Sequence, residues 1–292
     1  MAACSLPPRR LGTTALPDGR QLGWAEWGPE DGRPMLLCPG AAASRTVGLG
    51  TVELDSLGVR LVSVDRPGLG ASTASPLRTP PDFATDIGEL AARRGWRELG
   101  IVGCSQGAPF ALACAAAGLA GAVALVAPVN EVARPETARL LSRQVHQLAE
   151  LAALRPQEAE AFFAGFTPAA MRELILRNSP PCDRAVYQDP AFSAAHSRAL
   201  ALGFVQGSGG YARDTLLAMR SWGRDLSAIT APVDVWHGSE DRGHSPDPGE
   251  LLTTRIPGAE RRVVPGAGGS LLWTHACLIL QRLLARSVRD GC

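Results

Sequence analysis

The sequence contains no lysine: all 29 of its basic residues are arginines, and 28 acidic residues bring the formal net charge to +1. Schiff-base chemistry and a lysine general base are therefore excluded. The arginines are spread along the chain and form no run of the kind that marks a nucleic-acid or membrane surface. We expect a small-molecule partner, with no nucleic acid and no membrane. An all-arginine set is also typical of a GC-rich bacterial genome.

Metal and secretion signals are also lacking. The seven cysteines are odd in number and include no CxxC pair, so we predict free thiols and neither a disulfide framework nor a zinc site. No apolar run is long enough to span a membrane, and the N-terminus has no apolar segment after a basic start. We expect a cytoplasmic protein without metal or cofactor. The sequence does not specify an oligomeric state.

Composition and length favour one globular core. Hydrophobic residues make up 46% of the 292 positions and charged residues 20%, which is enough apolar surface for a packed interior. A chain of this length fits one α/β core that carries an inserted subdomain.

Short apolar runs closed by glycine or proline predict buried parallel strands. They lie at residues 34–38, 59–64, 99–102, 122–126, 232–236 and 260–264. Apolar positions at helical spacing predict helices over residues 81–96, 107–120 and 270–285. An Asp-Gly turn predicts a hairpin within residues 13–28.

The strand pattern stops between residues 130 and 222. Helical patterns replace it at residues 136–153, 156–166, 169–176 and 191–204. We therefore predict an α/β fold with a mostly parallel central sheet, flanked by helices and carrying an inserted helical cap. Its parts are residues 1–129 (core, first part), 130–222 (cap) and 223–292 (core, second part).

Residues 103–107 read GCSQG and lie between a predicted strand and a predicted helix. The two glycines permit the sharp turn that lifts the central serine off the sheet. Ser105 then lies at a helix N-terminus, where backbone NH groups favour a developing oxyanion. We predict Ser105 as a nucleophile. The neighbouring thiol of Cys104 should point away from the tip of the turn, and we interpret it as a packing residue.

Five motifs in this order resemble one known family. They are LPDGR at residues 16–20, DRPGLGAS at 65–72, VGCSQGAPFALAC at 102–114, WHGSED at 236–241 and PGAGGSLL at 265–272. Together they resemble the capped α/β-hydrolases of the ester-hydrolase and proline-iminopeptidase type. The resemblance implies the α/β-hydrolase fold, with Asp241 as the acid that orients a catalytic histidine. It also implies that the NH groups of Gln106 and Ala41 form the oxyanion hole.

Two positions depart from the family pattern. The His-Gly pair that precedes the second oxyanion amide reads Pro39-Gly40, although Ala41 retains its NH. The catalytic histidine of the family's Pro-Gly-x-Gly-His segment is replaced by Gly269. A serine without a general base is a poor nucleophile. We therefore predict a degenerate triad with a water-filled gap beside Gly269, and at least a tenfold gain in aryl-ester hydrolysis from Gly269→His, since a general base supplies roughly 10²-fold or more.

One histidine is a candidate replacement base. His244 follows Asp241 by three residues on the same loop, a separation that rarely lets both side chains face the serine. His275 lies six residues beyond Gly269, about 600° around a helix, and should point away from the site. The remaining histidines lie at the end of a predicted strand (His237) and in the cap (His146 and His196).

Three functions follow as alternatives. The first is hydrolysis of a small-molecule ester, amide or lactone through Ser105; the second is a non-hydrolytic lyase or cyclase; the third is ligand binding without catalysis. Ser105 and Asp241 favour the first two, whereas Gly269 favours the last two. Aromatic residues of the cap either line an apolar pocket or hold the cap together, and their number favours an apolar, drug-sized ligand. They are Phe162, Phe163, Phe166, Tyr187, Phe192 and Phe204.

Overall fold

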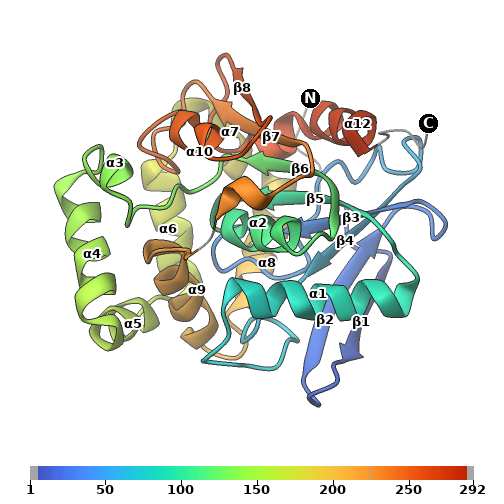
Figure 1. Cartoon of the computed structure of the whole chain (residues 1–292), viewed down its shortest axis with the longest axis horizontal. Helices are drawn as coiled ribbons and strands as arrows, with labels where there is room; N and C mark the ends of the chain where they lie inside the picture. Colours follow the sequence, from blue (N-terminus) through green and yellow to red (C-terminus); the bar gives the residue numbers. More distant parts are fainter. Residues whose placement is uncertain (1–5, 224, 288–292) are drawn as a thin grey trace.

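A computed structural model describes residues 6–223 and 225–287, and its centre is one twisted sheet (Figure 1). The strands of this part of the chain are β1 (Arg10–Ala15), β2 (Gln21–Trp27), β3 (Arg33–Cys38), β4 (Val59–Val64), β5 (Leu99–Cys104), β6 (Ala120–Val126), β7 (Val233–Gly238) and β8 (Glu260–Val264). Their order is β1-β2-β4-β3-β5-β6-β7-β8. The pairs β1–β2 and β2–β4 are antiparallel and the other neighbours are parallel. The predicted hairpin and mostly parallel sheet are confirmed.

The central strands are apolar on both faces because both faces are covered by helices. Leu36 and Ile101 point into a core shared with α1 (Pro80–Arg94), α2 (Ala108–Ala116) and α10 (Glu250–Thr254). Their neighbours Leu37 and Val102 point the other way, toward α11 (Leu271–Thr274) and α12 (Ala276–Ser287). Side chains alternate along a strand, so each buried run fills two cores. The helix predicted over 270–285 is divided, since the chain leaves helical geometry at His275.

The described chain between β6 and β7 forms helices and loops but no strand, and we call its α-helices the cap helices. They are α3 (Pro135–Ala138), α4 (Arg143–Leu154), α5 (Pro156–Ala164), α6 (Pro168–Asn178), α7 (Pro181–Gln188), α8 (Pro190–Gly203) and α9 (Gly209–Met219). Proline opens most of them, as its fixed φ and missing NH suit the first helical position. In Figure 1, α4, α5, α6 and α9 lie on the left, opposite the β1–β2 hairpin.

The cap pattern was predicted only in part. The helix expected over 136–153 is broken between α3 and α4. Neither α7 nor α9 was predicted, because Pro180-Pro181 and Gly209-Gly210 resemble loop sequence at their starts.

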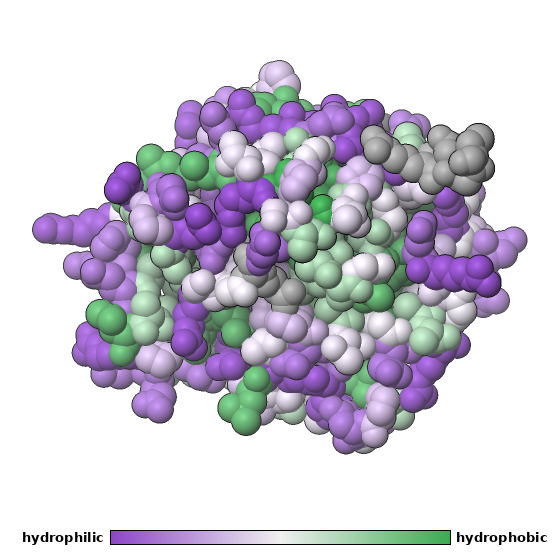
Figure 2. Space-filling model, viewed as in Figure 1, coloured by the Kyte–Doolittle hydropathy of each residue, from purple (hydrophilic) through white to green (hydrophobic). Residues whose placement is uncertain are grey.

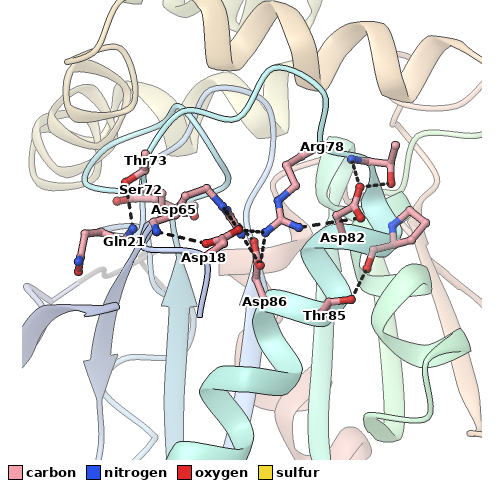
Figure 3. Close-up of polar contacts among 12 residues, drawn as sticks. Asp18, Gln21, Asp65, Ser72, Thr73, Arg78, Asp82, Thr85 and Asp86 are labelled. Carbon is pink, nitrogen blue, oxygen red and sulfur yellow. Dashed lines mark hydrogen bonds and ion pairs between the residues drawn. The ribbon is translucent and has the colours of Figure 1, made fainter. Parts of the chain in front are cut away.

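A polar network ties the hairpin turn to α1. Arg78 lies between Asp18 of the turn and Asp86 of the helix (Figure 3). Its Nη2 donates to Asp86 Oδ1 at 2.6 Å and to Asp18 Oδ2 at 3.3 Å, while Arg20 Nη2 also donates to Asp86 Oδ1 at 2.6 Å. Burial raises the pKa of Asp86 to about 6, against the opposing effect of Arg20. The two guanidinium groups thus balance a carboxylate buried between sheet and helix.

On the face that Figure 2 shows, hydrophobic residues form small separate groups among hydrophilic ones. Single exposed apolar residues such as Leu77 and Leu154 are ordinary on protein surfaces. No helix within the described residues is long and apolar enough to cross a bilayer.

Candidate active site

The turn after β5 holds Ser105 in an uncommon conformation. Its φ is 50°, a left-handed value that non-glycine residues rarely adopt and that often marks functional turns. Both flanking glycines are needed for close packing. A Cβ on Gly107 would lie 2.0 Å from the carbonyl oxygen of Cys38, and one on Gly103 would lie 2.6 Å from Cβ of Ala111. The predicted strand-turn-helix context of Ser105 is therefore present.

Asp241 lies just beyond β7 and is hydrogen-bonded to His244. The Nδ1 atom of His244 is 2.9 Å from Asp241 Oδ2. Asp241 Oδ1 also accepts the backbone NH groups of Gly243 at 3.0 Å and His244 at 3.3 Å. Burial favours a higher pKa for Asp241, but the charge and hydrogen bond of His244 and the NH of Gly243 hold its pKa down to about 2. Asp241 is thus a buried, ionised carboxylate paired with an imidazole.

The gap expected beside Gly269 is filled by the ring of His244. A Cβ on Gly269 would lie 2.3 Å from Cε1 and 2.6 Å from Nδ1 of His244. A separation of three residues was expected to keep the side chains of Asp241 and His244 from both facing the serine, but both border the cavity that Ser105 lines. The reason is local: two backbone NH groups donate to Asp241, and these bonds fold the loop back on its own carboxylate.

Ser105, Asp241 and His244 border one cavity. Because Nδ1 of His244 is hydrogen-bonded to Asp241, Nε2 is the ring nitrogen that this hydrogen bond does not use. No hydrogen bond joins Ser105 to His244 among those of the described residues, and such contacts commonly tighten only when substrate binds. Burial lowers the pKa of His244, but Asp241 and then Asp183 outweigh it, so the pKa lies above its ordinary value.

Asp183 of α7 is a site residue that the sequence did not indicate. Its side chain is buried, and its oxygens accept the NH groups of Gly269 at 2.8 Å and Ser270 at 3.0 Å. A Cβ on Gly268 would lie 2.3 Å from Asp183 Oδ2, so glycine there admits the carboxylate. Gly268 and Gly269 therefore receive two side chains from elsewhere in the chain, Asp183 and His244.

The segments that carry the predicted oxyanion amides approach Ser105. Gln106 lies in the first turn after Ser105, where helix geometry leaves NH groups without an intrahelical acceptor. A Cβ on Gly40 would lie 3.9 Å from Ser105 Oγ, and Ala41 borders the same cavity as Ser105. That the NH groups of Ala41 and Gln106 converge on one point stays a prediction.

The cavity has a volume of about 220 Å³ and a largely apolar wall, part of it from the cap. Met171, Leu174 and Ile175 line it from α6. Of the six cap aromatics, only Tyr187 lines it. Others hold the cap together, as the edge-to-face contact of Phe162 and Phe166 shows.

Other candidate groups lie elsewhere or are inert. Cys104 is buried, and burial raises the pKa of its thiol to about 12, which fits its interpretation as a packing residue. His275 borders a different cavity, together with Gly50 and Gln281. Within residues 6–223 and 225–287, no group of three or more His, Cys, Asp or Glu side chains is arranged to hold a metal ion.

Known proteins share this architecture. A family model described as "Alpha/beta hydrolase family" matches residues 35–283. The structure of esterase RhEst1 from Rhodococcus sp. ECU1013 is 20% identical, with a TM-score of 0.69 over 96% of this chain and 99% of the esterase. An enol-lactonase from Burkholderia xenovorans LB400 is 18% identical, with a TM-score of 0.68 over 94% of this chain and 98% of the lactonase.

A bromoperoxidase from Bacillus anthracis is 19% identical, with a TM-score of 0.68 over 96% of this chain and 100% of the peroxidase. No curated protein sequence matches the chain significantly. At these identities the structural likeness concerns the fold, which is the one that the sequence motifs implied.

Proposed function

Because the chain belongs to the alpha/beta hydrolase family, we propose that it hydrolyses small neutral carboxylic esters or lactones through Ser105, with His244 as general base. One observation carries the proposal: the His244 ring is bonded to Asp241 and fills the space beside Gly269, where the family motif has its histidine. The base is thus supplied from the loop of the acid instead of from the segment after β8.

Each residue then has a role in acyl transfer. Ser105 Oγ attacks the carbonyl carbon while His244 Nε2 takes its proton. Asp241 fixes the tautomer through Nδ1 and stabilises the imidazolium. The NH groups of Ala41 and Gln106 stabilise the oxyanion. The imidazolium next protonates the leaving alkoxide as the C–O bond breaks. Water, activated by the same imidazole, cleaves the acyl-enzyme and restores Ser105.

The cavity favours an uncharged substrate. Its lining includes the carboxylates of Asp183 and Asp241 but no arginine among the described residues. An acidic substrate would therefore meet repulsion from these carboxylates with no arginine in the lining to offset it. A volume of about 220 Å³ suits a short acyl or alkyl group.

The lyase, cyclase and binding-protein alternatives rested on the lack of a base at Gly269. The position of His244 supplies a candidate base, which supports hydrolysis over these alternatives.

The decisive test is labelling by a fluorophosphonate, followed by hydrolysis of p-nitrophenyl butyrate. We expect wild-type protein to be labelled and to turn over the ester. Ser105→Ala should abolish both, and His244→Ala should lower kcat/KM by at least about 10³-fold, as loss of a triad member does.

His275→Ala is the matched control, because this histidine borders another cavity. It should keep activity within about twofold of wild type, as a substitution away from the site usually has small effects. A folded His244→Ala variant with undiminished activity would exclude His244 as the base.

A further inference from the structure

Two consecutive residues of α9 are linked to the two segments that carry the proposed oxyanion amides, one directly and one through Arg66. Asp214 and Thr215 are buried, at 3% and 6% exposure. Asp214 Oδ2 accepts Nε of Arg66 at 2.5 Å. Thr215 Oγ1 accepts Nε2 of Gln106 at 3.0 Å and donates to the carbonyl of Tyr211 at 2.8 Å. One helix turn of the cap thus contacts the residue after the nucleophile directly and the loop after β3 through Arg66.

Arg66 holds the loop after β3 by its backbone carbonyls. Its Nη1 donates to the carbonyl of Pro39 at 2.6 Å and its Nη2 to that of Gly40 at 3.0 Å. Arg66 is 1% exposed, and its guanidinium lies over the ring of Phe110, 5.0 Å from the ring centroid. Each of its three nitrogens therefore has a fixed acceptor, and a buried fork of this kind sets the orientation of what it binds.

This grip fixes the direction of the Ala41 amide. The carbonyl of Gly40 and the NH of Ala41 belong to one planar peptide unit, in which they point in opposite directions. Because Arg66 takes the carbonyl, the NH of Ala41 points away from Arg66. A charged donor on the carbonyl also polarises the peptide and makes its NH a stronger donor.

The start of α9 packs closely against the loop that follows Arg66. A Cβ on Gly210 would lie 2.5 Å from the carbonyl oxygen of Gly68, in the loop that follows Arg66. Glycine at the start of α9 therefore lets the helix backbone meet this loop. The contact sets how far Asp214 and Thr215 stand from Arg66 and Gln106.

We propose that Arg66, Asp214, Thr215 and the Gln106 side chain form an oxyanion clamp, a set of positioning residues by which α9 fixes the spacing and aim of the two oxyanion amides. The clamp rests on the proposed function. It also explains how the loop tolerates Pro39, which lacks an NH: the loop is held by its carbonyls.

Two variants and two controls test the clamp by kinetics. Arg66→Lys keeps the charge but loses the forked guanidinium. We expect kcat for p-nitrophenyl butyrate to fall about 10- to 100-fold while KM stays within about threefold of wild type. This loss of kcat is smaller than the roughly 10²- to 10³-fold cost of deleting an oxyanion donor. Affinity for butyl trifluoromethyl ketone, which forms an oxyanion on the serine, should fall in step with kcat/KM. Thr215→Val should lower kcat about tenfold, while Thr215→Ser restores it to within about twofold, because it keeps the hydroxyl.

Arg10→Lys is the matched control, since Arg10 likewise bridges a carboxylate, Glu26, and a backbone carbonyl, that of Gly28. It should leave kcat unchanged. The ¹H–¹⁵N resonance of the Ala41 amide gives a readout independent of turnover: it should shift in Arg66→Lys and stay in Arg10→Lys.

An unmoved Ala41 resonance with undiminished kcat in folded Arg66→Lys and Thr215→Val would overturn the clamp. An inert, unlabelled wild-type protein would instead refute the proposed function, and the Ala41 resonance would still decide the clamp. If Arg66→Lys does not fold, Thr215→Val and Thr215→Ser carry the test.

Discussion

The ring of His244 occupies the space that a side chain at position 269 would need: Cε1 of the ring lies 2.3 Å from the point that a Cβ on Gly269 would occupy. Any side chain at position 269 must therefore displace the imidazole. Glycine at the position of the family's histidine therefore leaves the room that the ring of His244 occupies.

This overlap reverses the effect expected from the sequence for Gly269→His. With His244 in place, the new side chain should overpack the site, cost about 1–3 kcal/mol of unfolding free energy and lower esterase activity. Thermal unfolding and p-nitrophenyl butyrate hydrolysis measure both effects. Gly88→Ala is the control, because outside the backbone of its own helix a Cβ there meets no atom closer than 3.9 Å.

Moving the base back should work only when His244 is removed. In the double variant His244→Ala/Gly269→His, an imidazole again has room beside Asp241. We expect its kcat/KM to exceed that of His244→Ala by at least about tenfold, a small part of the effect of a well-placed base. Equal rates in the two variants would mean that position 269 no longer aims a side chain between Asp241 and Ser105.

Activity should fall on the acid side as His244 takes up a proton. The pKa of His244 lies above its ordinary value because of Asp241 and Asp183, so the acid limb of kcat/KM should lie above pH 6.5. Asp183→Asn removes one of these charges, and the limb should move to lower pH. His237 also faces Asp241 and His244. Only a protonated His237 would lower the pKa of His244, and the lowered pKa of His237 disfavours that form. An unchanged limb in Asp183→Asn would show that its charge does not reach the base.

The Asp241–His244 pair should stabilise the fold most at mildly acidic pH. The raised pKa of His244 gives a contribution that is complete below its unfolded value near 6.5 and is lost as pH rises through the folded value. The pKa of Asp241, about 2, gives one that is lost only as pH falls from about 4 through 2. A double-mutant cycle of Asp241→Asn and His244→Ala should give about 1.5–3 kcal/mol at pH 5.5 and less at pH 9. A larger coupling energy at pH 9 would contradict this assignment.

Charge at the far end of the substrate should decide selectivity. We expect kcat/KM for p-nitrophenyl butyrate to exceed that for p-nitrophenyl hemisuccinate by at least about tenfold, since one repulsive contact of about 1.4 kcal/mol suffices for that ratio. Stopped-flow release of p-nitrophenol at several ionic strengths measures it. A preference for the acidic ester would mean that a cation outside the cavity lining recognises the substrate.

The sequence predicted what periodicity and turn chemistry encode. Buried strands appear as continuous apolar runs because helices cover both faces of the sheet. The GCSQG turn needs glycine at positions 103 and 107 because a Cβ there would collide with neighbouring atoms. Asp241 and His244 were both identified. Their contact was not, because it depends on two backbone hydrogen bonds to one carboxylate oxygen.

Contacts between distant segments also lay beyond the sequence. Asp183 reaches Gly269 and Ser270 from a helix whose start resembles a loop. Asp214 reaches Arg66 across 148 positions of chain. Neither pairing leaves a local pattern in the sequence, because each depends on how the cap packs against the sheet.

Asp241 and His244 lie three residues apart on one loop, and this arrangement changes how such chains should be surveyed. A census that identifies inactive hydrolases by the absence of histidine from one alignment column would count this chain as a pseudoenzyme. A census that asks which imidazole reaches the carboxylate would not. In such a chain both groups lie within four consecutive residues, and the segment after the last strand must keep glycine at positions 268 and 269 to leave room for Asp183 and His244.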